Sequence, residues 1–269
     1  MTTAQDKVTV PGLAAMKAAG RRIVCLTAYD AAFARVLAAA GVDVVLVGDS
    51  LGMVLLGFET TIPVTLEHMV HHAAAVSRAA GRMLRVVDMP FLAHADVATA
   101  VAAARRLMQE GGAEMVKLEG GSELVPIVEH LAALGVPVCG HLGLQPQSVH
   151  RIGGYRVQAR DPEAGAKLLA DARALEAAGA GLLVLECVPR RLAAEVTAAL
   201  HIPVIGIGAG PDVDGQVLVL HDLLGITPPP HPRFVRDFLR GRGSVQDAVV
   251  AYVEAVRGGT YPAEGEWYA

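Results

Sequence analysis

The sequence predicts a (β/α)8 barrel, also called a TIM barrel, and three observations support this fold class. The chain has 269 residues, close to the roughly 250 that one such barrel commonly needs. Short apolar segments alternate along it with alanine-rich segments of helical period. The short apolar segments number eight, at residues 23–28, 42–47, 83–87, 115–118, 136–139, 181–185, 203–207 and 217–220.

The eight apolar segments are predicted to be β-strands. Each is bounded by Gly, Pro or an acidic residue, and short continuous apolar runs suit strands of a parallel sheet that are buried on both faces. No Gly-x-Gly-x-x-Gly turn follows the first segment, so nothing supports an open dinucleotide-binding sheet. The count of eight favours a closed barrel.

The segments between the strands are predicted to be helices, because alanine is the best helix former. They are residues 31–40, 66–80, 97–110, 123–134, 162–178 and 192–200. Residues of the types that cap helix N-termini precede them, at Asp30, Thr65, Asp96, Ser122 and Asp161. Glycines that commonly end helices follow four of them, at Gly41, Gly111, Gly135 and Gly179.

The remaining segments complete one predicted domain over residues 1–269. The connection from Gly48 to Leu66 is long, and connections of that length are often functional. Three consecutive prolines at residues 228–230 must lie in a loop. We expect a short N-terminal extension before the barrel, and after it a helix at residues 245–256 and a tail.

Composition limits the class of protein. Hydrophobic residues make up 53% of the chain, which excludes general disorder, and a net charge of -4 does not suit nucleic acid or an anionic membrane. Residues 1–11 do not resemble a signal peptide, and no apolar run approaches a membrane span. The separated cysteines Cys25, Cys139 and Cys187 are expected to be buried reduced thiols. These features predict a soluble cytoplasmic protein.

Carboxylates follow six of the predicted strands, at Asp30, Asp49, Asp88, Glu119, Glu186 and Asp222. In a barrel the carboxyl ends of the strands meet at one mouth, where active sites are built. Asp30 directly precedes a helix and is better explained as an N-cap, whereas Asp222 suits either role. The other four are less easily explained as caps. A cluster of such oxygen ligands suits a hard cation such as Mg²⁺, and a hydrated acidic rim is the alternative.

Lys117 is predicted to point into the barrel. It lies two residues before Glu119 on one strand, so both side chains share a face. Three roles fit a lysine there: a Schiff-base nucleophile, a structural cation in a salt bridge, or an electrostatic partner for an anionic substrate. Gly206, Gly208 and Gly210 could cradle a phosphate or simply permit a tight turn.

Eight motifs occur in order between about residues 8 and 262. They are Thr27-Ala28-Tyr29-Asp30, Val47-Gly48-Asp49-Ser50-Leu51-Gly52, Asp88-Met89-Pro90-Phe91, Val116-Lys117-Leu118-Glu119-Gly120-Gly121, Gly140-His141-Leu142-Gly143-Leu144, Gly153-Gly154-Tyr155, Leu185-Glu186-Cys187-Val188-Pro189 and Ile205-Gly206-Ile207-Gly208-Ala209-Gly210. Together they resemble the ketopantoate hydroxymethyltransferase family, which transfers a hydroxymethyl group from 5,10-methylenetetrahydrofolate to 3-methyl-2-oxobutanoate in pantothenate and coenzyme A synthesis.

The resemblance implies roles for individual residues. Asp49 and Asp88 are expected to contact Mg²⁺ and the keto acid, and Glu119 to be a further metal-site carboxylate. Lys117 and Ser50 are expected to bind the substrate, and Glu186 to be the proton acceptor. The family also implies a (β/α)8 barrel and a homodecamer. His141 either orients the substrate or is a structural histidine.

The chain departs from the family pattern at a few positions. Residues 92–94 replace small and hydroxyl residues near a tyrosine, and Arg156 and Ala159 replace a more usual lysine and glycine. The triple proline is also unusual. None of these positions coincides with a proposed metal or base residue.

Three other functions remain open. A lyase or mutase acting on phosphoenolpyruvate-like substrates would need a reactive cysteine in an active-site loop, whereas the three cysteines lie in or beside strands. A Schiff-base aldolase through Lys117 would work without metal. A barrel that only binds metabolites or partners would leave the C3 proton of the keto acid unexchanged.

Overall fold

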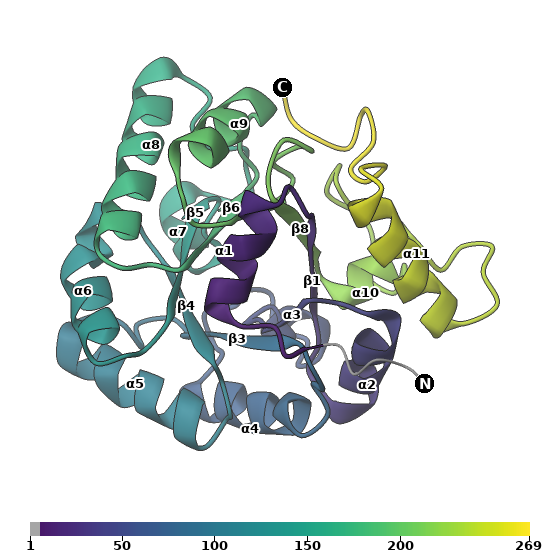
Figure 1. The fold of residues 1–269 in the computed structure, drawn as a ribbon, viewed down its shortest axis with the longest axis horizontal. Coiled ribbons are helices and arrows are strands. Elements are labelled where there is room, and N and C mark those ends of the chain that lie inside the picture. The colour runs from purple at the N-terminus through teal and green to yellow at the C-terminus, as the bar shows by residue number, and fades with distance from the viewer. Residues whose placement is uncertain (1–5) are drawn as a thin grey trace.

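The structure is a computed structural model that describes residues 6–269, and it is a closed barrel of eight parallel strands (Figure 1). The strands are β1 (Ile23–Thr27), β2 (Val44–Val47), β3 (Leu84–Asp88), β4 (Met115–Glu119), β5 (Val138–Gly143), β6 (Leu182–Glu186), β7 (Val204–Ile207) and β8 (Gly215–Leu218). Each strand pairs with the next, and β8 pairs with β1. The predicted fold class is therefore confirmed.

The strands form the core of the molecule. Every residue of β1, β2, β4, β7 and β8 is buried, because one face points into the barrel and the other against the helices. Burial on both faces explains why the strands are nearly continuous apolar runs in the sequence.

The six predicted helices surround the strands. They are α2 (Ala31–Ala40), α4 (Leu66–Ser77), α5 (Val97–Gln109), α6 (Val125–Ala133), α8 (Pro162–Ala177) and α9 (Arg190–Ala199). Asp30, Thr65, Asp96 and Asp161 each accept a hydrogen bond from a backbone N–H of the first helical turn, as predicted. Ser122 does not. It begins a short 3₁₀ turn (Ser122–Leu124), and its side chain caps no helix.

Two strands, β5 and β8, differ most in extent from the prediction. β5 begins and ends later than the predicted residues 136–139. Its backbone pairing with β4 and β6 extends the strand through Gly140 to Gly143, although glycine is a weak strand former. As a result His141 is a strand residue opposite Glu119. β8 ends earlier than predicted, since Leu220 begins the short helix α10 (Leu220–Leu223).

No helix joins β7 to β8, and the C-terminal helix fills the corresponding place in the outer ring. This helix, α11 (Val245–Arg257), matches the predicted residues 245–256 and packs on α2 and β1. The Tyr252 hydroxyl lies 2.9 Å from the Cys25 carbonyl oxygen on β1 and 3.0 Å from that of Gln216 on β8. The helix thus anchors the seam at which the barrel closes.

Besides α10, three further short helices were not predicted. The helix α1 (Val10–Ala18) lies across the barrel end at which the strands begin, where Lys17 Nζ donates to the Ile202 carbonyl oxygen just before β7 (Figure 1). The helix α3 (Leu51–Val54) lies in the long connection after β2, and α7 (Val149–Ile152) follows β5. Within residues 6–269, no helix is both long and apolar enough to cross a membrane.

Candidate active site

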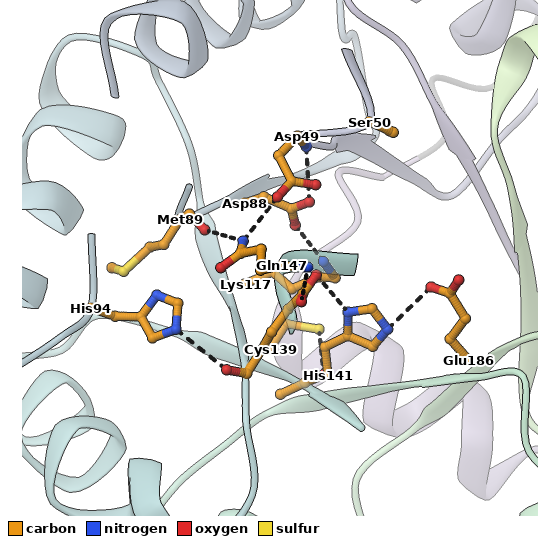
Figure 2. Close-up of polar contacts among 12 residues, drawn as sticks. Asp49, Ser50, Asp88, Met89, His94, Lys117, Cys139, His141, Gln147 and Glu186 are labelled. Atoms are coloured by element: carbon orange, nitrogen blue, oxygen red, sulfur yellow. Dashed lines mark hydrogen bonds and ion pairs between the residues drawn. The ribbon is translucent and has the colours of Figure 1, made fainter. Parts of the chain in front are cut away.

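A cavity of about 740 Å³ opens at the carboxyl ends of the strands. All seven residues that the sequence analysis assigned to the site line it, namely Asp49, Ser50, Asp88, Lys117, Glu119, His141 and Glu186. They come from the ends of β2 to β6 or from the residues that follow, because parallel strands bring their carboxyl ends to one mouth (Figure 2).

Lys117 and Asp88 form a buried ion pair in the floor of the cavity. Lys117 Nζ lies 2.6 Å from Asp88 Oδ1, and both side chains are almost fully buried. Burial alone would lower the pKa of Lys117, but Asp88, Glu119 and Asp49 outweigh it and raise the pKa above its usual value. Lys117 is therefore a firmly held ammonium ion, which disfavours the Schiff-base role because an imine needs the neutral amine.

Asp49 is a buried carboxyl beside two others. The other Asp88 oxygen, Oδ2, accepts a hydrogen bond from the Asp49 backbone N–H at 3.0 Å, which ties the ends of β2 and β3 together. Burial, Asp88 and Glu119 raise the pKa of Asp49 well above its usual value, against the smaller effects of Lys117 and Gln147. The raised pKa means that a proton or a further cation at Asp49 relieves the repulsion among these carboxyl groups.

Gln147 is a site residue that the sequence analysis missed. Its side-chain amide donates to Asp49 Oδ2 at 2.8 Å and to the Met89 carbonyl oxygen at 2.9 Å. Its backbone N–H donates to Glu119 Oε2 at 3.0 Å. Gln147 lies beyond the predicted end of the fifth strand, and the only signal was a polar residue after Pro146 near the mouth.

His141 connects two carboxylates. Its Nδ1 lies 3.4 Å from Glu119 Oε1 and its Nε2 lies 3.3 Å from Glu186 Oε2 (Figure 2). These distances are long for hydrogen bonds, so the contacts are mainly electrostatic. Burial and Lys117 would lower the pKa of His141, but the two carboxylates outweigh them and raise it to about 9. His141 is thus a cation at neutral pH.

The remaining residues named in the sequence analysis lie in or beside the cavity wall. Ser50 Oγ is 2.9 Å from the Tyr29 hydroxyl, which places Ser50 beside the first strand. Asp30 is an N-cap outside the cavity wall, as favoured. Asp222 lies within α10 and lines the cavity, so it is not a cap. The long connection after Gly48 contributes Met53, Phe58 and Thr61 to the wall (the first two are partly exposed).

The glycines after β7 serve packing. A Cβ on Gly208 would clash with the Phe234 ring, and one on Gly210 would lie 2.8 Å from the Arg190 side chain. Both residues have positive φ angles, 64° and 87°. These constraints account for the glycines by a tight turn and give no support to a phosphate cradle.

The three cysteines are buried and unpaired, as expected. Burial raises the pKa of each thiol, that of Cys139 to about 12. Nucleophilic cysteines need a lowered pKa and access to substrate. None of the three has these properties, so reactive-cysteine chemistry is not supported.

The carboxylates are not arranged as a ready-made metal cage. Within the described part of the chain, no group of three or more His, Cys, Asp or Glu side chains could hold a metal ion by itself. Asp88 and Glu119 instead use oxygens for contacts with Lys117, His141 and Gln147. Any metal here would need ligands from substrate or water as well as from the protein.

The chain matches the model of a known protein family. The model of the family described as ketopantoate hydroxymethyltransferase matches residues 7–264. A 3-methyl-2-oxobutanoate hydroxymethyltransferase from Alkalilimnicola ehrlichii is 57% identical over 95% of this chain and 92% of its own length. One from Methylococcus capsulatus is 54% identical over 96% of both chains.

Solved structures show the same barrel at low sequence identity. A 2,3-dimethylmalate lyase, a member of the PEP mutase/isocitrate lyase superfamily, has a TM-score of 0.56 at 17% identity and covers 81% of each chain. A phosphoenolpyruvate phosphomutase from Streptomyces platensis subsp. rosaceus has a TM-score of 0.58 at 16% identity, covering 79% of this chain and 82% of its own. These likenesses concern the fold alone.

Proposed function

Because the chain belongs to the ketopantoate hydroxymethyltransferase family, we propose that it makes ketopantoate from 3-methyl-2-oxobutanoate and 5,10-methylenetetrahydrofolate. A C–C bond forms between C3 of the keto acid and the one-carbon unit, whose bonds to the folate nitrogens break, and water supplies the hydroxyl oxygen. The observation that carries this proposal is the convergence of Lys117, Glu186 and three further carboxylates on one cavity.

Two carboxylates are proposed to hold Mg²⁺. Asp49 and Asp88 lie at adjacent strand ends, and their oxygens are the donors that Mg²⁺ prefers. Mg²⁺ is commonly bound by one or two carboxylates together with substrate oxygens and water, so a three-ligand protein cage is not required. When bound, the ion would polarise the ketone and make the adjacent C–H more acidic. Glu119 would add negative charge beside this pair.

Lys117 and Ser50 are proposed to bind the keto acid. Lys117 is held as a cation at the floor of the cavity, where it would attract the substrate carboxylate and stabilise the negative charge of the enolate. The Ser50 hydroxyl, positioned by Tyr29, would donate a hydrogen bond to the same carboxylate. Both residues orient C3 toward the opposite side of the barrel mouth.

Glu186 is proposed to be the general base. It lies at the end of β6, away from the Asp49–Asp88 pair, and is the carboxylate of the cluster most open to the cavity, with 16% of its side chain exposed. His141 lies beside one of its oxygens and would hold the carboxylate while it removes the C3 proton. His141 is in this account a positioning residue, charged at neutral pH.

The assembly and location implied by the family are also proposals. A homodecamer and a cytoplasmic enzyme agree with the family membership, but their support is the resemblance alone.

Proton exchange tests this function directly. In deuterated buffer with Mg²⁺, the chain should exchange the C3 proton of 3-methyl-2-oxobutanoate, followed by proton NMR, and should form ketopantoate when methylenetetrahydrofolate is added. Borohydride with keto acid should leave the protein mass unchanged, because no imine forms at Lys117. Keto acid binding without exchange would instead identify a binding protein, and a reduced adduct would identify a Schiff-base enzyme.

A further inference from the structure

The cavity is far larger than a small branched keto acid requires. Pockets of roughly 300–1,000 Å³ enclose ligands of drug size, and this cavity measures about 740 Å³. The charged residues assigned to the keto acid and to catalysis come from the ends of β2 to β6. The wall formed by the segment after β8 has no part in that assignment. The following inference rests on the proposed function, which supplies a second and larger substrate.

The wall after β8 is mainly apolar, with Asp222 as its one carboxylate and His221, Thr227 and His231 as its other polar residues. We call it the β8 chamber and define it by the lining residues Asp222, Ile226, Pro230 and Phe234. Phe58, from the long connection after β2, lines the same cavity. Ile226 is 59% exposed, so its side chain presents apolar surface at the mouth of the cavity. Proline and phenylalanine rings present flat apolar surfaces, which suit a flat fused heterocycle.

Asp222 is the carboxylate of this chamber. Burial raises the pKa of its carboxyl group above the usual value, while Thr227, His231 and His221 oppose the rise. Its electrostatic partners are these histidines rather than a lysine or arginine. A partly buried carboxylate with no firm cation is an acceptor for N–H groups of a ligand.

We propose that the β8 chamber binds the tetrahydropterin head of the one-carbon donor through its aminopyrimidine edge. This edge carries a ring N–H and an exocyclic amino group side by side. The two oxygens of Asp222 can accept both in a bidentate arrangement. The apolar residues Pro230 and Phe234 cover the faces of the ring system. The other ring, which bears the one-carbon unit, then points away from the chamber toward the keto acid.

Charge decides which end of the folate enters the chamber. The p-aminobenzoylglutamate end carries carboxylates, and the cavity already contains Asp222 and the catalytic carboxylates. Like charges in a partly buried site repel one another. The pterin head carries no carboxylate and offers donors. The chamber therefore takes the head, and the anionic tail extends to solvent.

Binding of tetrahydropterin alone tests the chamber. Asp222→Asn keeps the shape but loses the charge and one acceptor oxygen. Its affinity for tetrahydropterin, measured by calorimetry on the full chain, should fall by about 10- to 100-fold, as expected for hydrogen bonds to a charged group. The matched control is Glu59→Gln, which alters an exposed carboxylate lining the same cavity and should bind like wild type.

A second variant and a second readout keep the test independent of folding. Ile226→Lys places an ammonium ion near Asp222 from an exposed position, and should also weaken tetrahydropterin binding. Both variants should still exchange the C3 proton of the keto acid at the wild-type rate, which shows that they fold. The proposal would be overturned if both variants bound tetrahydropterin with wild-type affinity. It would also be overturned if the variants bound tetrahydropterin normally but lost the binding of p-aminobenzoylglutamate. If the variants bind tetrahydropterin more weakly but the wild-type protein exchanges no C3 proton, the β8 chamber is supported and the proposed function is refuted.

Discussion

At the scale of single residues, the site depends on which groups lie close to each carboxylate. Gly48 illustrates this, since a Cβ there would lie 2.8 Å from Ser50 Oγ and 3.4 Å from Asp88 Oδ2. Glycine therefore leaves room for the hydroxyl and carboxylate oxygens on which substrate binding is proposed to depend. Gly143 has a similar role, because a Cβ would clash with the Glu186 backbone oxygen. These two glycines allow the close approach of neighbouring strand ends.

Glu186→Gln separates binding from chemistry at the residue scale. The variant keeps the size and polarity of the side chain but cannot accept the C3 proton at neutral pH. We expect exchange and ketopantoate formation to fall by roughly 10²- to 10⁴-fold, the usual contribution of a general base. Proton NMR in deuterated buffer measures the exchange, and titration calorimetry measures keto acid binding, which should remain.

The control for this variant is again Glu59→Gln, at an exposed position of the same cavity. It should exchange the proton like wild type. A wild-type exchange rate in Glu186→Gln would assign the base to another residue.

At the scale of elements, the β8–β1 seam and the loop before α8 are the instructive cases. The seam depends on α11, whose Tyr252 reaches the backbone of both strands. In the loop, Ala159 has a φ angle of 53°, in the left-handed region that favours glycine. This explains why glycine is the more usual residue there, and alanine tolerates the conformation at some cost in backbone strain.

Tyr252→Phe tests the contribution of α11 to barrel closure. The change removes a buried hydroxyl and leaves the carbonyl oxygens of Cys25 and Gln216 without it. We expect the free energy of unfolding to fall by about 1–3 kcal/mol, measured by urea denaturation. The control is Tyr155→Phe, because Tyr155 is 50% exposed and contributes no buried hydroxyl. Equal stability of Tyr252→Phe and wild type would show that the hydroxyl does not stabilise the seam.

At the scale of the whole molecule, the barrel collects carboxylates that are far apart in the sequence and so creates the demand for a cation. The carboxylates of the site outnumber its cations, since Lys117 and His141 share the cavity with Asp49, Asp88, Glu119 and Glu186. Exhaustive chelation should therefore abolish turnover, and added Mg²⁺ should restore it. If Mg²⁺ binds only the folded state, a Mg²⁺ concentration of about 100 times its Kd should raise the free energy of unfolding by about 2.7 kcal/mol. This gain should appear as a higher melting temperature.

Two asparagine variants make the metal prediction specific. Asp49→Asn should lose the stabilisation by Mg²⁺. Asp30→Asn should keep it, because Asp30 is a helix cap outside the cavity and asparagine caps helices equally well. Full activity after chelation would contradict the metal assignment.

The sequence by itself determined the barrel and most of the site. Eight parallel strands that are buried on both faces must be short and apolar, so their number and order can be predicted from the sequence. Residues at the carboxyl ends of such strands must share one mouth, which placed Asp49, Asp88, Lys117 and Glu186 in the same cavity. These inferences need only local patterns and a general rule of the fold.

Only the tertiary structure decided the contacts between elements. The extent of β5 depends on its pairing with β4 and β6. The sequence did not predict this extent, because the strand contains Gly140 and Gly143. Gln147 reaches Asp49 and Met89 across the barrel mouth, and Asp222 lines the cavity instead of capping a helix. Such contacts join residues distant in the chain, and their energies depend on distance and burial in three dimensions. No local periodicity encodes them.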